Sequence, residues 1–277
     1  MRFEFLGTGT SAGVPNIGCD CRVCTSTDPR DNRLRTSAAI TFRDEKASHE
    51  GGERVILIDA GPDLRQQALR AKMSRCDAIL FTHNHVDHTF GLDEVRRFNV
   101  VQRAPVNLYA EEKTHEFLRR VYQHVFDASK NVNDSFVASV VAWRISATLE
   151  PIELYGLQVT PIRLLHGRLP VVGYRFDPAP GSTLIAPWMP LAYCTDVSAI
   201  PPESWSRLAG VRTLVLDALR QRKHPTHLTL DQAVIIAERI EAKQTWFVHM
   251  AHDLMHGETD EGLPEGMGLA YDGLVLE

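Results

Sequence analysis

Short apolar runs that end in a histidine or an aspartate constrain the fold of this chain more than any other feature. Each run is aliphatic or β-branched, short, and bounded by turn-forming residues, which is typical of a buried strand. Reactive groups commonly gather where strand ends meet loops, so the pattern predicts a site built from strand ends. The six runs are 54–58 before Asp59, 78–82 before His83, 157–165 before His166, 191–195 before Asp196, 214–216 before Asp217 and 245–248 before His249.

Helical spacing of apolar residues appears between some of these runs. The sequence predicts helices over 63–73, 91–102, 111–124 and 230–243. Pro62 suits the start of the first helix, and Thr229 can cap the last. Residues 44–53 are predicted to be an exposed hairpin or loop, and residues 178–190 are predicted to be a loop insertion. Strands mixed with helices predict an α/β layered domain, and we treat residues 1–277 as a single domain with a Cys-rich loop at 19–24.

Composition excludes several classes of protein. Thirty Lys and Arg against 35 Asp and Glu give a net charge of −5, which argues against an extensive nucleic-acid surface. The N-terminus has no secretory pattern, and no apolar run approaches the roughly 18–20 residues that span a bilayer. Five cysteines, an odd number, do not fit a secreted disulfide framework. We therefore expect a cytoplasmic chain without a membrane partner; the sequence leaves its oligomeric state open, with a homodimer as one expectation.

The densest cluster of reactive side chains is His83-Asn84-His85-Val86-Asp87-His88, directly after a predicted strand. A tight loop can direct His83 and His85 to one metal ion, and Asp87 and His88 to a second. Imidazole and carboxylate ligands together suit zinc, manganese or iron. The alternative is a polar loop with coincidental histidines, and four potential ligands within six residues argue against it.

The His-x-His-x-Asp-His motif resembles the signature of the metallo-β-lactamase superfamily, and the later strand-terminal residues follow in that family's order. The resemblance runs from about Phe3 to about Leu276 and implies a four-layer αββα metallo-β-lactamase fold. It implies that Asp59 is a buried aspartate that orients the metal loop without binding metal. The ligands it implies are His83, His85 and His166 for one metal, Asp87, His88 and His249 for the other, and Asp196 as the bridge between them.

With these ligands the resemblance implies two divalent ions, zinc or manganese, and a metal-dependent hydrolase. Two ions roughly 3.5–4 Å apart would hold a bridging hydroxide near neutral pH. The hydroxide would attack phosphorus or a carbonyl carbon, while the metals stabilise the developing oxyanion. We therefore expect Asp87 to act in catalysis as well as to bind metal.

A second cluster, Cys19-Asp20-Cys21-Arg22-Val23-Cys24, brings three thiols together near the N-terminus. Three close cysteines in a cytoplasmic protein favour a metal over a disulfide. A closed structural zinc site needs a fourth ligand, for which His227 is the first candidate and His224 the second. The alternative is a set of ordinary reduced thiols.

Residues 7–15, Gly-Thr-Gly-Thr-Ser-Ala-Gly-Val-Pro, followed by Cys-x-Cys-x-x-Cys, resemble the PhnP-type branch of the superfamily. That branch comprises phosphoribosyl 1,2-cyclic phosphate phosphodiesterases that carry such a structural zinc. Pyrroloquinoline-quinone biosynthesis protein B (PqqB) has a related N-terminal pattern, whereas the intact histidine motif favours the hydrolytic branch. The resemblance thus implies a phosphodiesterase acting on small or cyclic phosphodiesters.

Several assignments stay open in the sequence. His224 is a candidate for the general acid or for a phosphate contact, and Arg220 for phosphate binding, although both suit surface or zinc-supporting roles. His252 could support the metal ligands from outside or simply pack. The competing functions are a tRNA 3′-end endonuclease, a thioester or lactone hydrolase, and a non-catalytic PqqB-like carrier.

Overall fold

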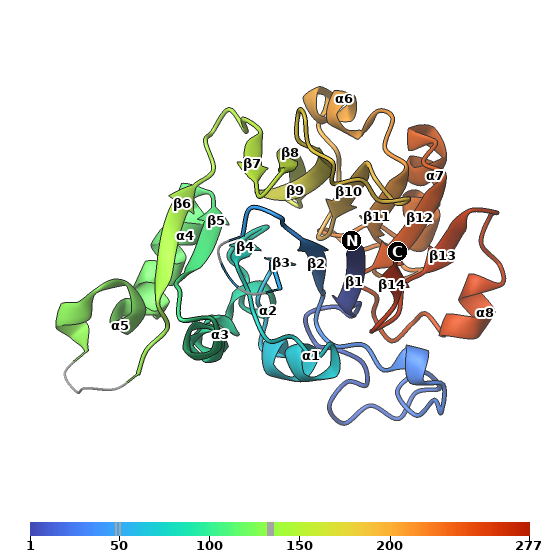
Figure 1. The fold of residues 1–277 in the computed structure, drawn as a ribbon. Helices are drawn as coiled ribbons and strands as arrows, with labels where there is room; N and C mark the ends of the chain where they lie inside the picture. The colour runs from blue at the N-terminus through green and yellow to red at the C-terminus, as the bar shows by residue number, and fades with distance from the viewer. Residues whose placement is uncertain (48, 50, 132–135) are drawn as a thin grey trace.

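The computed structural model covers the 277 residues and describes all of them except 48, 50 and 132–135. Within the described residues the strands form two seven-stranded sheets (Figure 1). The first sheet has the spatial order β14 (Val275–Leu276), β1 (Arg2–Gly7), β2 (Ser37–Arg43), β3 (Glu53–Ile58), β4 (Ala78–Leu80), β5 (Val106–Ala110) and β6 (Val140–Arg144). The second has the order β13 (Met267–Leu269), β12 (Gln244–Val248), β11 (Thr213–Asp217), β10 (Leu191–Cys194), β9 (Leu169–Pro178), β8 (Leu157–His166) and β7 (Ile152–Leu154).

Each sheet is half antiparallel and half parallel. In the first, β14 to β3 pair antiparallel and β3 to β6 pair parallel. In the second, β13 to β10 pair parallel and β10 to β7 pair antiparallel. The carboxyl ends of neighbouring parallel strands lie at the same edge of a sheet, so the reactive residues that follow β4, β10, β11 and β12 can meet there.

The two sheets pack face to face around a shared apolar core. Phe3, Ile56 and Leu80 from the first sheet belong to one buried cluster with Tyr174 and Val215 from the second. These side chains are fully excluded from solvent or nearly so. Central strands such as β11 are buried along their whole length, which explains their continuous apolar sequence.

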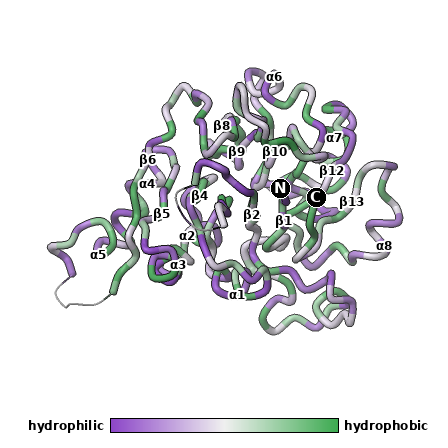
Figure 2. The backbone as a smooth tube through the Cα atoms, viewed as in Figure 1, coloured by the Kyte–Doolittle hydropathy of each residue, from purple (hydrophilic) through white to green (hydrophobic). Residues whose placement is uncertain are grey.

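Helices cover the outer face of each sheet. Separate apolar clusters hold α1, α3 and α4 against the first sheet and α6 and α7 against the second. Along the tube in Figure 2 the helices carry hydrophilic and hydrophobic residues, as expected for helices with one buried face. This arrangement confirms the predicted four-layer αββα architecture. The helices are α1 (Leu64–Arg70), α2 (Val86–Thr89), α3 (Val95–Gln102), α4 (Glu112–Val121), α5 (Gln123–Phe126), α6 (Trp205–Leu208), α7 (Leu230–Ile240) and α8 (His256–Asp260), with short 3₁₀ turns η1 (Pro29–Asp31), η2 (Leu92–Glu94), η3 (Ala128–Lys130) and η4 (Pro202–Ser204).

Local structure follows the sequence closely, with one helix divided. The predicted capping role of Thr229 is confirmed, because its side chain accepts a hydrogen bond from the Gln232 N–H in a capping box. The helix predicted over 111–124 is instead α4 and α5, separated at Tyr122, whose backbone leaves helical geometry at φ −108° and ψ 47°. The Tyr122 side chain is buried and its hydroxyl donates to the Thr89 carbonyl at 3.2 Å, so a tertiary contact accompanies the break.

Two further predictions concern loops and membranes. The predicted loop over 44–53 includes residues 48 and 50, which lie outside the described residues; its described part closes between β2 and β3, where the Asp44 N–H donates to the Gly52 carbonyl. None of the helices in the described part of the chain is long and apolar enough to cross a bilayer.

Candidate metal centre

The reactive residues at the strand ends leave the strands by an unusual backbone turn. Asp59 after β3, Asp196 after β10 and His249 after β12 all adopt left-handed backbone angles, with φ of 61°, 55° and 61°. A residue other than glycine in this conformation costs on the order of 1–3 kcal/mol and tends to occur at functional sites. The turn ends each strand abruptly and leaves the side chain at the edge shared by the two sheets.

Asp59 fixes the loop that carries the histidine motif. Its carboxylate is fully buried and accepts hydrogen bonds from the Thr82 N–H and hydroxyl, both at 2.8 Å, and from Nδ1 of His88 at 2.7 Å. The loop also packs against Gly61, where a Cβ atom would lie 2.0 Å from the Asp87 carbonyl oxygen. Glycine at position 61 is therefore required by the close approach of the two backbones.

The seven residues predicted as metal ligands come together in two groups that adjoin one another. One contains His83, His85, His166 and Asp196, and the other Asp87, His88 and His249; within each group the potential ligand atoms lie within 4.8 Å of one another. Asp196 lies between the groups. Its Oδ2 is 3.2 Å from Nε2 of His88, and its Oδ1 is 3.3 Å from Nε2 of His249 and 3.9 Å from Nε2 of His83.

The unsatisfied atoms of the centre fit a pair of divalent cations. Nε2 of His83, His88 and His249 is buried in each case and has no hydrogen-bond partner among the described residues. Buried polar atoms normally have partners, so three ring nitrogens beside two carboxylates require an explanation. Imidazole nitrogen and carboxylate oxygen are ligands of zinc and manganese, and the divalent metal use implied by the fold provides that explanation.

Hydrogen bonds on the far side of each ring set its orientation. Nδ1 of His83 contacts the Thr82 hydroxyl at 2.9 Å, and Nδ1 of His166 donates to the Thr226 carbonyl at 2.7 Å. His88 is held in the same way by Asp59. With Nδ1 engaged, Nε2 is the nitrogen that faces the centre, as is usual for histidines that bind metals.

The charges of the centre are strongly coupled. Burial raises the pKa of Asp196, but positive charge on His249 and His88 outweighs burial and holds it well below its ordinary value. Burial lowers the pKa of His249, yet the negative charges of Asp196 and Asp87 raise it to about 9. The carboxylates of the centre thus create a strongly negative surrounding, which divalent cations would compensate.

His227 belongs to this centre, although sequence reasoning made it the first candidate for the cysteine site. It is buried, its Nδ1 donates to Oδ2 of Asp217 at 3.0 Å, and it forms a group with Asp196 and His249 whose potential ligand atoms lie within 4.8 Å of one another. Its ring stacks on that of His249 with centroids 4.7 Å apart. The ten residues after Asp217 fold back so that His227 lies beside Asp217 again. No signal in the sequence predicts this turn of the chain.

His224 and Arg220 lie farther out. The His224 ring centroid is 5.2 Å from that of His227, and its Nδ1 contacts the Thr226 hydroxyl at 3.1 Å. Nε of Arg220 donates to the Arg222 carbonyl at 3.2 Å, and its backbone bridges to Thr229. Both side chains are half-buried, so they flank the histidines of the centre without closing it off.

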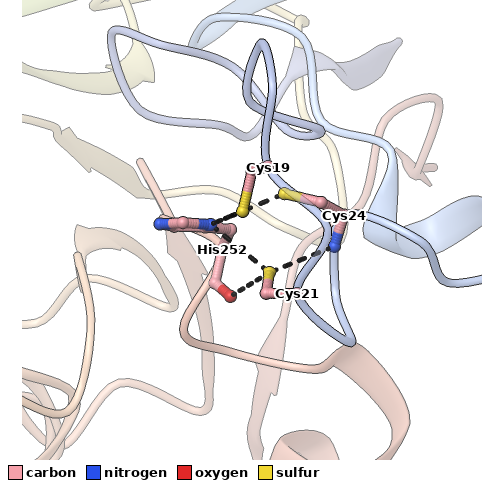
Figure 3. A group of neighbouring side chains, drawn as sticks. All are labelled: Cys19, Cys21, Cys24 and His252. Carbon is pink, nitrogen blue, oxygen red and sulfur yellow. Dashed lines mark hydrogen bonds between the residues drawn. The ribbon is translucent and has the colours of Figure 1, made fainter.

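The three clustered cysteines meet His252, not His227 or His224 (Figure 3). Nδ1 of His252 is 3.2, 3.4 and 3.5 Å from the sulfurs of Cys19, Cys21 and Cys24. Zinc bonds of about 2.3 Å to sulfur and 2.0–2.1 Å to nitrogen, arranged as a tetrahedron, place ligand atoms about 3.5 Å apart. The geometry therefore fits one tetrahedral ion and corrects the predicted fourth ligand.

The cysteine site also has suitable acid–base properties. The backbone N–H of Cys24 lowers the pKa of the Cys21 thiol to about 6, whereas burial raises that of Cys24 to about 11. A thiolate, not a thiol, binds metal, and one is thus available near neutral pH. In the sequence, His252 stands out only because it lies three residues after His249. The tertiary fold brings it beside the cysteine loop, some 230 residues earlier in the chain.

The family model described as a beta-lactamase superfamily domain matches residues 54–250. The chain belongs to the metallo-β-lactamase superfamily. Members of this superfamily are mostly hydrolases. A solved structure of a new diphosphatase from the PhnP family is 43% identical to this member, with a TM-score of 0.84, and the match covers 100% of this chain and 97% of that one.

Curated relatives carry other names. An octanoyltransferase of Porphyromonas gingivalis is 36% identical over 99% of this chain, but the chain spans only 51% of that protein. Coenzyme PQQ synthesis protein B of Methylobacterium nodulans is 29% identical over 78% of this chain and 72% of that protein. Membership of the superfamily implies use of divalent metal. The names of the relatives, in contrast, describe different functions.

Proposed function

We propose that this chain is a phosphodiesterase that uses two divalent metal ions, zinc or manganese, to hydrolyse small or cyclic phosphodiesters. The observation that carries the proposal is Asp196, whose two oxygens adjoin both ligand groups. A carboxylate shared in this way suits a two-metal site for in-line displacement at phosphorus. Similarity to a PhnP-family diphosphatase along almost all of both chains supports phosphate chemistry.

In this proposal His83, His85 and His166 would hold one ion, Asp87, His88 and His249 would hold the other, and Asp196 would serve both. When bound, the ions supply Lewis-acid chemistry: they lower the pKa of water and neutralise charge that develops on the phosphoryl oxygens. Asp59 and Thr82 maintain the ring orientations on which that arrangement depends. Cys19, Cys21, Cys24 and His252 hold a separate structural zinc.

We assign the proton donor to His227 and not to His224. Asp217 accepts from Nδ1 of His227, which fixes the tautomer and the orientation of the ring. Nε2 is then free to carry a second proton to the leaving oxygen, the step in which an alkoxide needs protonation. His224 and Arg220 are left as contacts for the phosphoryl group or for the leaving group.

The competing functions differ from the proposed one in the bond that is cleaved, in the size of the substrate, or in cleaving no bond at all. Similarity to the octanoyltransferase suggests acyl chemistry as an alternative. That protein is about twice as long as this chain. A carrier role is raised by the similarity to PQQ synthesis protein B. The net charge of −5 weighs against a tRNA 3′-end endonuclease.

The test combines elemental analysis with turnover of bis(p-nitrophenyl) phosphate, a ribose 1,2-cyclic phosphate, 2′,3′-cyclic nucleotides and an acyl thioester. We expect about three metal ions per chain and turnover of phosphodiesters. Turnover should be lost in His85→Ala, which removes one imidazole ligand, while the ion at the cysteines remains. Turnover of the thioester alone would overturn the proposal, and metal without turnover of any phosphodiester would favour the carrier.

A further inference from the structure

The ring of His249 is held differently from those of other histidines in the metal centre. A hydrogen bond at Nδ1 fixes the rings of His83, His88 and His166. Nδ1 of His249 has no hydrogen-bond partner among the residues that the structure describes, and Oδ1 of Asp217 lies 3.8 Å away, beyond hydrogen-bond distance. The backbone of His249 is left-handed, a conformation that persists only where the surroundings impose it. The direction of this ring therefore depends on how the chain around it is held.

The chain that follows His249 is held by one buried guanidinium, that of Arg33. Its Nη1 donates to the Ala251 carbonyl at 3.0 Å, and its Nη2 donates to the Leu254 carbonyl at 2.5 Å. The Arg33 side chain is fully excluded from solvent, and Asp31 compensates its charge at 3.0 Å. Charged side chains are almost never fully buried unless they are paired, so this arrangement requires an explanation.

Arg33 is itself fixed to a rigid part of the chain. Its backbone exchanges two hydrogen bonds with Val14, at 2.8 and 2.9 Å. Gly9 packs so closely against it that a Cβ atom there would lie 2.9 Å from Cβ of Arg33. Gly9 also forms a β-bridge with Met250, the residue after His249. The backbone bridge and the guanidinium thus tie the same segment to residues 250–254.

The chemistry of arginine suits this place. A guanidinium carries five N–H donors in one plane, so a single side chain can hold two carbonyls and a carboxylate at once. The two carbonyls lie on either side of His252, the ligand expected at the cysteine site. Arg33 therefore holds the turn through its backbone and not through the ring of His252.

We propose that Arg33 is a positioning residue for the metal centre. By holding the carbonyls of Ala251 and Leu254, it keeps the turn at His249 in the conformation that directs Nε2 of this ring to the ion shared with Asp87 and His88. The proposal deepens the function proposed above and rests on its assignment of His249 as a ligand.

Binding of Mn²⁺ tests this role apart from turnover. Mn²⁺ prefers oxygen ligands to thiolates, so it probes the paired centre and not the cysteines. The full chain is titrated after removal of its active-centre metal, and free Mn²⁺ is measured by electron paramagnetic resonance below the melting temperature of each variant. We expect the unaltered protein to bind two ions and Arg33→Met to raise the Kd of one of them about tenfold, the low end of what loss of an outer partner costs a metal site.

Arg175→Met is the matched control. The Arg175 guanidinium likewise holds two carbonyls, those of Arg207 and Ala209, and the carboxylate of Asp177, but it does so at the end of α6. This variant should lower the melting temperature and leave both Kd values unchanged, because loss of stability alone does not alter the affinity of the folded protein. Unchanged Kd values in folded Arg33→Met, or the same increase in Arg175→Met, overturn the proposal.

Arg33→Lys carries the test if Arg33→Met does not fold. It keeps the charge beside Asp31, but its single ammonium cannot span both carbonyls. The same one of the two ions should therefore bind more weakly than in the unaltered protein, by less than in Arg33→Met. Affinities equal to those of the unaltered protein overturn the role of Arg33.

Turnover of bis(p-nitrophenyl) phosphate distinguishes this proposal from the function on which it rests. Arg33→Met should lose most of its turnover at a Mn²⁺ concentration near the Kd of the unaltered protein, and should recover as Mn²⁺ is raised. Hydrolysis with the same dependence on Mn²⁺ in both proteins overturns the role of Arg33 and leaves the phosphodiesterase intact. Two ions bound by the unaltered protein, one of them weakened in Arg33→Met, without hydrolysis of any phosphodiester, overturn the phosphodiesterase and support the role of Arg33.

Discussion

The two ring nitrogens of His227 have different surroundings, and the difference defines what the residue can do. Nδ1 is held by Asp217 at 3.0 Å, which leaves Nε2 for another partner, and the residue belongs to the group formed with Asp196 and His249. A histidine oriented by a carboxylate in this way can act as an acid, as a base or as a metal ligand. Leaving-group dependence separates the acid from the ligand.

We expect His227→Gln to slow hydrolysis of a phenyl phosphodiester by about 10² or more in kcat, and that of the matching p-nitrophenyl ester far less. The reason is that p-nitrophenolate leaves without protonation, whereas phenolate benefits from it. Kinetics on the two esters, with metal content measured alongside, provide the check. His224→Gln serves as the control and should change the rate of hydrolysis of both esters equally. Equal losses in His227→Gln together with loss of metal would assign the residue as a ligand instead.

His252 permits an independent test of the cysteine site. His252→Ala should lower the metal content from about three ions per chain to about two and reduce thermal stability, because a tetrahedral site loses one of its four ligands. Phosphodiester turnover at low temperature should persist, since the paired ligands of the active centre are untouched. Elemental analysis and thermal melts measure both effects. A third ion that is retained in His252→Ala but lost in His227→Ala would show that His227, as predicted from the sequence, is the fourth ligand of the cysteine site.

At the scale of elements, Asp77 connects β3 to β4 at the opposite end of β4 from the metal loop. Its carboxylate accepts from the Val55 N–H at 2.9 Å, Arg54 at 2.8 Å and Arg75 at 2.7 Å. Burial raises the pKa of Asp77, but these donors, led by Arg75, outweigh burial and lower it. A carboxylate with a lowered pKa contributes stability above its unfolded pKa of about 3.9, and the contribution is lost as the pH falls through the folded pKa.

Asp77→Asn should therefore reduce the free energy of unfolding by about 2 kcal/mol at pH 7, where the charged form makes these bonds. The difference between the two proteins should be smaller at pH 3, below the unfolded pKa of about 3.9, because protonation of the carboxylate there favours the unfolded chain. Urea denaturation of both chains with the metals removed tests this at the two pH values. A difference that is the same at both would mean that the charge of Asp77 contributes nothing.

The elements themselves could largely be predicted from sequence because their signals are local. The run before His166 is β8, the run before His249 is β12, and Thr229 caps α7 as expected. The division between α4 and α5 could not be predicted, since it accompanies burial of Tyr122 against a distant loop. The prediction of His227 instead of His252 as the fourth ligand of the cysteine site was wrong for the same reason. Which histidine reaches the cysteines depends on how residues 217–227 and 249–252 fold back, not on spacing along the chain.

For the molecule as a whole, the centre joins the two sheets. His83 follows β4 of the first sheet, while His166, Asp196 and His249 end strands of the second. An ion that binds only the folded arrangement stabilises it by RT ln(1 + [L]/Kd), about 4 kcal/mol at a thousandfold excess over Kd. The metal ions should accordingly govern global stability as well as activity.

Removal of the metals by a chelator should lower the melting temperature by roughly 10 °C, the size that about 4 kcal/mol produces in a chain of this length. Calorimetric scans with and without chelator provide the measurement. In Asp196→Asn the chelator should have a smaller effect, because the shared ligand is weakened while the cysteine site is intact. An unchanged melting temperature after complete metal removal, verified by elemental analysis, would rule out this coupling.

β1 and β14 are neighbours in the first sheet, with Phe3 opposite Leu276. The first and last residues of this chain are thus already held within a few residues of one another by backbone hydrogen bonds. A short linker could join them, and new ends could be opened in the loop around Gly181, where the backbone is left-handed and no atom lies within 4 Å of the Cβ position. Such a circular permutant would keep all the strand ends that form the metal centre, and would show that their order along the chain is not what builds it.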